Sequence, residues 1–101
     1  MVAGRGEKMT KAEIIRVFRE ITDPYELDVG ILFVKPNKQF AARALREDLG
    51  RYLIELTELN IEHLVHEIAH VLEWHIHGNS SDHGYQWMQI YEELEEKYVQ
   101  N

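Results

Sequence analysis

The residues best suited to chemistry stand at His66-Glu67-Ile68-Ala69-His70, an HExxH sequence. If this segment is helical, its two histidines lie on one face, about 6 Å apart along the axis, and both imidazoles can bind one metal ion. Glu67 lies beside that face, where its carboxylate can accept a proton from a metal-bound water without being a ligand. The pattern therefore predicts a metal site with a general base next to it.

A third ligand must come from outside this pair, because catalytic zinc usually takes three protein ligands and keeps a position for water. His83 is one candidate, since six extended residues can span the roughly 10 Å by which the helix leads away from His70. The spacing leaves other donors open. They are His63, His75, His77, Glu92 and Glu93.

The stretch HEIAHVLEWHIHGNSSDHGYQWM, which begins at His66, resembles the SprT-like metallopeptidases. Their pattern is HExxH on a helix, a short loop, and then HG followed by a bulky aromatic residue and often a methionine. Here His83-Gly84, Trp87 and Met88 match the second block. The resemblance implies one Zn²⁺ ion per chain. It assigns the site to the metal ligands His66, His70 and His83 and the catalytic residue Glu67.

This family resemblance implies a zinc metallopeptidase that hydrolyses peptide bonds in proteins or peptides by a zinc-bound water that Glu67 activates. No substrate-binding residue is assigned. Residues 40–46 are the candidate sheet edge for an extended substrate, with ordinary strand packing as the other interpretation. Tyr85 and His77 are the candidates for an oxyanion partner, although packing or solvation explains them better.

Two other classes of protein fit the same residues. The first is a catalytically inactive protein-interaction module that zinc stabilises, in which a carboxylate at Glu67 has no task. The second is a histidine-rich, pH-responsive binding protein without metal. The ordered spacing of the histidines argues against the metal-free binding protein, whereas Glu67 is the residue that distinguishes the peptidase from the interaction module.

The resemblance and the hydrophobic spacing together predict an α+β fold, a minimal zincin-like domain. Thr10 and Glu13 form a capping-box pattern that starts an N-terminal helix, and Asp23-Pro24 ends it. Alternating apolar residues predict strands over 27–35, 40–46 and about 52–56. With a hairpin loop over 47–50, these neighbouring strands indicate a small, mainly antiparallel meander.

Two further helices follow the strands. Asn60 is a good N-cap for the HExxH helix, and Gly78-Asn79 supplies a left-handed stop. Apolar spacing between Trp87 and Tyr98 predicts a C-terminal helix. Trp74 and Trp87 are expected to pack in the core, and the acidic run 92–96 is expected to be a solvated helix face.

The length of 101 residues predicts a single domain, and the glycine-rich, non-periodic start predicts a flexible N-terminus over 1–9. The resemblance implies that the domain over 10–101 is a SprT-like metallopeptidase domain. With 18 acidic and 11 basic residues, the net charge of −7 argues against direct nucleic-acid binding, apart from a local basic strip at Arg43, Arg46 and Arg51. The absence of cysteine restricts metal ligands to nitrogen and oxygen. No signal peptide or membrane span is expected, and the predicted location is cytoplasmic.

Overall fold

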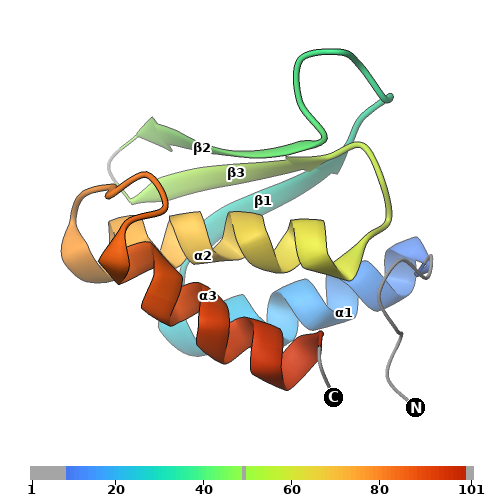
Figure 1. The fold of residues 1–101 in the computed structure, drawn as a ribbon. Helices are drawn as coiled ribbons and strands as arrows, with labels where there is room; N and C mark the ends of the chain where they lie inside the picture. The colour runs from blue at the N-terminus through green and yellow to red at the C-terminus, as the bar shows by residue number, and fades with distance from the viewer. Residues whose placement is uncertain (1–8, 49, 100–101) are drawn as a thin grey trace.

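A computed structural model describes residues 9–48 and 50–99. This part of the chain forms an α+β fold with three α-helices and a three-stranded sheet. The helices lie on one side of the sheet, and the helix α2 (Ile61–His77) runs directly beneath the strands (Figure 1). None of the helices in these ranges is long and apolar enough to span a membrane.

The first helix, α1 (Lys11–Thr22), begins at the predicted capping box. The Thr10 hydroxyl accepts a hydrogen bond from the Glu13 N–H at 3.1 Å, and the Glu13 carboxylate accepts one from the Thr10 N–H at 2.8 Å. Pro24 lies in the short 3-10 helix η1 (Asp23–Tyr25) that follows α1 directly. Asp23 keeps helical dihedral angles, with φ of −57° and ψ of −41°, and its N–H bonds to the Arg19 carbonyl, so it is not pushed out of the helical region as predicted. The predicted end of α1 is nevertheless confirmed, because Pro24 has no N–H to continue the helical hydrogen bonds.

The sheet is mixed, and the predicted meander is wrong. Its strands are β1 (Asp28–Phe33), β2 (Ala42–Asp48) and β3 (Arg51–Leu56), in the order β1-β3-β2. β3 pairs antiparallel with β2 and parallel with β1. The segment 34–41 carries the chain from β1 past the end of β3, and at eight residues it is long enough to span two strand spacings of about 4.8 Å.

The central strand β3 is the most buried strand of the sheet. Tyr52, Ile54 and Leu56 alternate along β3, and all three are buried. The edge strands β1 and β2 bury their residues only in part. Hydrophobic alternation predicts each strand but carries no information on which strands pair.

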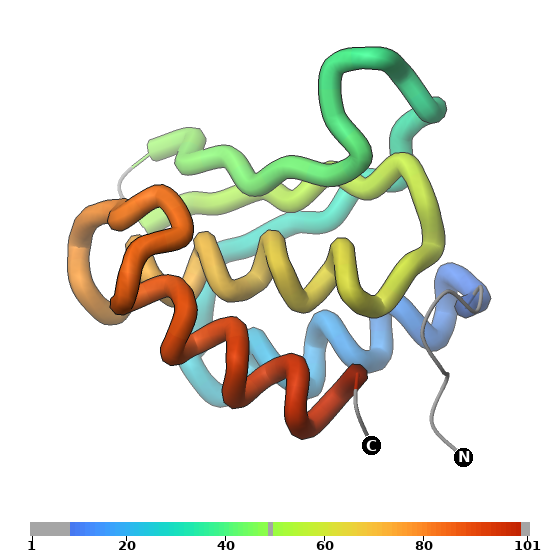
Figure 2. Tube along the Cα trace, viewed as in Figure 1, coloured from blue at the N-terminus to red at the C-terminus, as the bar shows by residue number. Residues whose placement is uncertain are grey.

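The loop before β2 moves that strand along the sequence by two residues from its predicted bounds. The Asn37 side-chain oxygen accepts hydrogen bonds from the N–H groups of Gln39 at 2.9 Å and Phe40 at 3.0 Å. This local turn holds residues 37–40 outside the sheet, and the segment projects beyond the end of the strands (Figure 2). At the other end β2 includes Glu47 and Asp48, which were predicted to be loop residues.

The hairpin between β2 and β3 is correspondingly short. Gly50 adopts a left-handed conformation with φ of 78°, which a side chain would strain. Leu49, the other residue of the predicted loop, lies outside the described residues.

The helix α2 is the centre of the domain and contacts β2, β3, α1 and α3 (Tyr85–Tyr98). It begins at Asn60, whose side chain accepts a hydrogen bond from the His63 N–H at 3.1 Å. It ends at Gly78, with φ of 78° and an N–H bond to the Trp74 carbonyl at 2.9 Å. Both predicted caps are confirmed. The fully buried apolar residues of α2 are Leu64, Val65, Ile68, Ala69 and Val71.

The start of the described chain is part of this core. Met9 is buried, and its N–H bonds to the Leu59 carbonyl at 3.1 Å, although the sequence analysis counted it with the flexible N-terminus. Residues 1–8 of that predicted segment lie outside the described residues.

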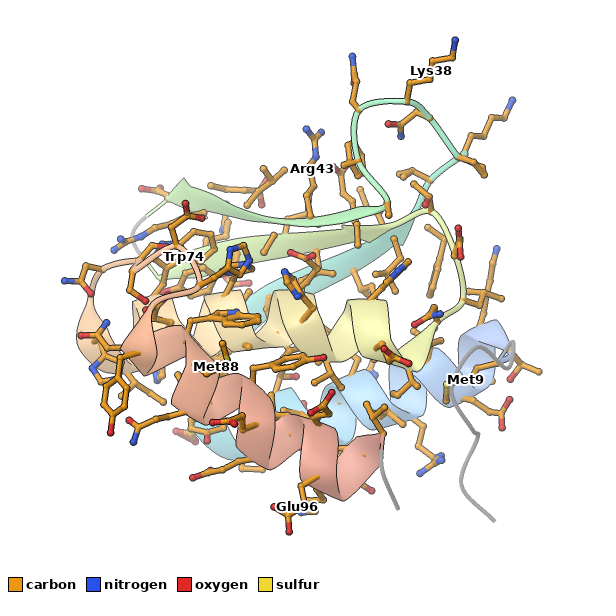
Figure 3. The ribbon with its side chains drawn as sticks, in the orientation of Figure 1. Met9, Lys38, Arg43, Trp74, Met88 and Glu96 are labelled. Atoms are coloured by element: carbon orange, nitrogen blue, oxygen red, sulfur yellow. The ribbon has the colours of Figure 1, made fainter. Side chains whose placement is uncertain are left out.

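Charged side chains of opposite sign point away from opposite sides of the domain. Lys38 lies at the tip of the loop before β2, and Glu96 points away from α3 on the far side (Figure 3). Glu92, Glu93 and Glu96 are exposed, as expected for a solvated face, whereas Glu95 is half-buried and accepts a hydrogen bond from Tyr91 at 3.2 Å.

Replacing Ile54 by alanine should lower the free energy of unfolding by about 2–5 kcal/mol, because its side chain is fully buried. The matched control is Leu32→Ala on the neighbouring β1, where 49% of the residue is exposed and the expected loss is below about 1 kcal/mol. Urea denaturation with chelator present measures both. Equal losses in the two variants would contradict the position of the core.

Candidate metal centre

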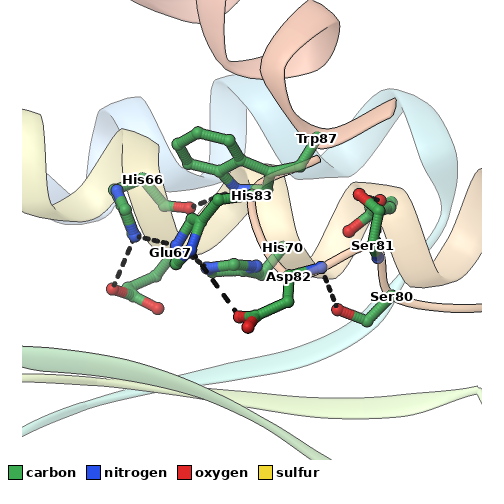
Figure 4. A network of polar contacts seen from close by, with 9 residues as sticks. His66, Glu67, His70, Ser80, Ser81, Asp82, His83 and Trp87 are labelled. Carbon is green, nitrogen blue, oxygen red and sulfur yellow. Dashed lines mark hydrogen bonds and ion pairs between the residues drawn. The ribbon is translucent and has the colours of Figure 1, made fainter. Parts of the chain in front are cut away.

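Three histidine side chains meet at one point above α2. His66 and His70 come from successive turns of this helix, and His83 comes from the loop that follows it (Figure 4). The His83 Nε2 atom lies 3.0 Å from the Nε2 atoms of both His66 and His70. One nitrogen from each ring lies within 4.8 Å of the others, close enough to bind a metal ion.

A reversal of the chain brings His83 to this point. Gly78 ends α2 in a left-handed conformation, and Asp82 and His83 have positive φ angles of 51° and 72°. Positive φ is uncommon for residues with a side chain, and more so for two in succession. The loop folds back over the end of α2 before α3 begins (Figure 2).

Trp87 forms a wall of the histidine cluster. Its ring lies 4.6 Å from His83, 4.8 Å from His66 and 5.4 Å from His70, measured between centroids. Its indole N–H donates to the His66 carbonyl at 3.4 Å, and its other neighbour is the stacked ring of Tyr91 at 4.8 Å. Trp87 is buried, as predicted, but it is buried against the candidate ligands. Trp74 stacks on Tyr52 at 5.9 Å, and its ring lies 6.4 Å from that of His70.

The surroundings favour neutral imidazoles. Burial, followed by repulsion from His70 and His83, lowers the pKa of His66 to about 4. Burial and the proximity of His83 also lower the pKa of His70, against a smaller opposing effect of Glu73 and Asp82. Neutral imidazoles have a free nitrogen lone pair, which is the form that binds a metal.

Glu67 lies next to the cluster but is not a member of it. Its Oε2 atom lies 4.0 Å from the His66 Nε2, and the residue is only 7% exposed. Burial raises the pKa of Glu67 to about 7, and a hydrogen bond from the backbone of Ala44 in β2 acts in the opposite direction. The carboxylate therefore occupies the space between α2 and the edge strand, beside the ligand nitrogens.

A pocket of about 320 Å³ opens on the same side of the cluster as Glu67. One wall comes from residues 40–42 at the start of β2, and the floor comes from α2 and α3. The lining side chains from the two helices are Glu62, His63, His66, Glu67 and Tyr91.

The other predicted donors lie elsewhere. In the described ranges the metal-binding group consists of His66, His70 and His83 alone. His63 lines the pocket, and His75 is exposed with its ring 6.1 Å from that of Tyr25. The remaining candidates are exposed, namely His77, Glu92 and Glu93.

Both candidates for an oxyanion partner are exposed to solvent. Tyr85 is 76% exposed, and its hydroxyl accepts a hydrogen bond from Gln89 at 2.9 Å. His77 is exposed as well. Solvation therefore explains both residues, as the sequence analysis favoured.

Sequence reasoning missed three residues around the centre. Trp87 is expected only to pack, Tyr91 is part of the apolar spacing that predicts the last helix, and Glu73 has no predicted role. The sequence does contain an indication for Glu73, because this carboxylate stands between Leu72 and Trp74 in an apolar part of the predicted helix. The positions of Trp87 and Tyr91 next to His66 depend on how α3 packs on α2.

Comparison with known proteins gives no relative: no protein-family model matches the chain, and no curated protein matches it significantly.

The cluster predicts a site for one metal ion, whose affinity depends on His83 and can be measured with zinc. The His83→Ala variant should bind zinc at least about 100-fold more weakly, a larger effect than the roughly 10- to 100-fold loss typical of residues that only support a ligand. Competition with a chromophoric chelator measures the dissociation constant. His75→Ala is the matched control, since it removes an exposed imidazole outside the cluster. Equal affinities for His83→Ala and the parent would refute the ligand assignment.

Proposed function

We propose that this protein is a zinc-dependent peptidase of the SprT-like kind, in which His66, His70 and His83 hold one Zn²⁺ ion and Glu67 is the general base. The observation that carries the proposal is the convergence of three imidazole nitrogens with a buried carboxylate at their side. Imidazole suits zinc among the borderline divalent metals, and three protein ligands are usual for catalytic zinc.

The reaction is hydrolysis of a peptide bond. When bound, zinc supplies Lewis acidity, which polarises the scissile carbonyl and makes water easier to deprotonate. Glu67 accepts a proton from the attacking water while the new C–O bond forms. It then gives the proton to the amine nitrogen as the C–N bond breaks, so the products are a carboxylic acid and an amine, and Glu67 is ionised again.

The position of Glu67 suits this role. Its Oε2 atom is 4.0 Å from the His66 Nε2, and Glu67 is not in the group of three side chains whose donor atoms lie within 4.8 Å of one another. The carboxylate is therefore beside the cluster, close enough to hydrogen-bond a water bound there. The wall of β2 and the backbone of Ala44 hold the carboxylate on this side of α2. A general base must lie within hydrogen-bond reach of the proton that it takes, directly or through one water.

The proposed substrate is a protein or peptide segment in an extended conformation. β2 is an edge strand of the sheet and borders the pocket beside His66 and Glu67. An extended peptide can add to such an edge through main-chain hydrogen bonds, with a side chain in the neighbouring pocket. The edge proposed from sequence, residues 40–46, becomes the strand Ala42–Asp48 preceded by the pocket residues Phe40 and Ala41.

The alternative is a catalytically inactive interaction module that zinc stabilises. A structural zinc site normally has a fourth protein ligand, whereas the candidate ligands among the described residues number three. The side chains of His66 and His83 are also 36% and 46% exposed, so solvent reaches the cluster. Both observations favour a site with room for water and substrate.

Glu67→Gln should bind zinc as tightly as the parent and hydrolyse an unfolded test protein about 10²- to 10⁴-fold more slowly, because the amide cannot accept the proton. Zinc content by elemental analysis and cleavage of a fluorescently labelled casein measure the two properties.

The matched control is Glu92→Gln, which makes the same change at an exposed position on α3 and should leave both properties unchanged. Turnover by Glu67→Gln at the parent's rate would remove the general base from the proposal. A parent that binds zinc but cleaves no peptide bond would favour the interaction module.

A further inference from the structure

We propose that Glu73 is a positioning residue of the metal centre: its buried carboxylate latches the loop 78–84 onto α2, and this latch holds His83 against His66 and His70. The inference rests on the metal centre of the proposed function and does not require peptidase activity. We call the contacts of Glu73 with Ser81 and Gln86 the latch.

The carboxylate of Glu73 collects donors from both sides of His83. Its Oε2 atom accepts hydrogen bonds from the Ser81 N–H at 3.0 Å, from the Ser81 hydroxyl, and from the Gln86 side-chain amide at 3.2 Å. Ser81 precedes His83 by two residues, and Gln86 follows it by three. The latch therefore closes the ends of the segment that carries the third ligand.

The short span between those ends is constrained internally. The Gly84 N–H bonds to the Ser81 carbonyl at 3.1 Å, and a Cβ atom at Gly84 would lie only 2.9 Å from the Cβ of Ser81. Asp82 and His83, between these residues, have positive φ angles. Because Ser81 and Gly84 are in contact, a carboxylate that fixes Ser81 also fixes the direction of His83.

Apolar packing contributes little to holding this loop. Residues 78–80 and 82–83 are exposed, and Ser81 and Gly84 are half-buried. His83 has its ring contacts with the other two histidines and with Trp87. A solvent-exposed loop with strained dihedral angles needs specific polar contacts to keep one conformation.

The burial of Glu73 is unfavourable in free energy by itself. The residue is 0% exposed, and its Oε1 atom has no hydrogen-bond partner among the described residues. Burial of a carboxylate is unfavourable unless its hydrogen bonds compensate for lost hydration. Burial raises the pKa of Glu73, but the bonds from Ser81 and Gln86, together with His70, outweigh it and hold the pKa below its ordinary value. The charged form is therefore the one that the loop donors bind.

The test compares zinc affinity in four proteins: the parent, Glu73→Gln, His83→Ala and the double variant. Glu73→Gln should bind zinc about 10- to 100-fold more weakly, as is usual when the group that orients a ligand is removed. In the His83→Ala background the same substitution should change the affinity less than about twofold, because it acts only through His83. Glu92→Gln, which is exposed and outside the cluster, is the control for the change in charge.

A second measurement examines the latch without metal. With chelator present, the Ser81 N–H should exchange with solvent at least about tenfold faster in Glu73→Gln than in the parent, as measured by NMR, because its acceptor is weakened. Ser81→Ala removes the hydroxyl donor and keeps the carboxylate, and it should also weaken zinc binding. This variant tests the latch if Glu73→Gln fails to fold.

Three results would overturn the proposal. The first is a zinc affinity in both Glu73→Gln and Ser81→Ala equal to that of the parent. The second is a loss of zinc affinity from Glu73→Gln that is as large in the His83→Ala background as in the parent. The third is a Ser81 N–H that exchanges in Glu73→Gln at the parent's rate. The peptidase proposal fails separately, when a parent that binds zinc does not cleave.

Discussion

Burial of the apolar face of α2 against the sheet and α1 fixes the rotation of this helix about its axis, and the site depends on that rotation. With Leu64 and Ile68 fully buried, a turn of 100° per residue directs His66 and His70 to the opposite side, toward α3 and the following loop. The one-turn spacing presents the two histidines together, and the apolar contacts decide what they face. A helix free to rotate would present the same pair without a fixed direction relative to His83.

The same rotation separates two carboxylates that flank the histidine face. Glu67 lies toward β2 and the pocket, whereas Glu73 lies toward the loop that carries His83. Both are buried, yet their partners differ: Glu67 has a backbone contact with Ala44, and Glu73 collects three donors from Ser81 and Gln86. Their pKa values accordingly shift in opposite directions, up for Glu67 and down for Glu73. One acid is left with little compensation for burial, and the other is stabilised in its charged form.

α3 completes the centre without supplying a ligand. Trp87 and Tyr91 stack on each other and lie against His66, so the packing of α3 on α2 also builds one side of the histidine cluster. The side chains of His66 and His83 remain 36% and 46% exposed. The cluster is therefore packed against two aromatic rings of α3 and is still reached by solvent.

Features that involve residues a few positions apart can be predicted from the amino-acid sequence. The capping box at Thr10, the helix stops at Pro24 and Gly78, and the one-turn spacing of His66 and His70 follow from local sterics and hydrogen bonds. Three other features appear only when the chain is folded: the parallel pairing of β1 with β3, the return of His83 to α2 and the placement of Glu73 beneath its loop. These features join segments that are far apart along the chain, and hydrophobic periodicity carries no information on which segments meet. The choice of His83 over His63, His75 and His77 is such a case, because reach along the chain permits it but the contact with Trp87 and the turn between Ser81 and Gly84 select it.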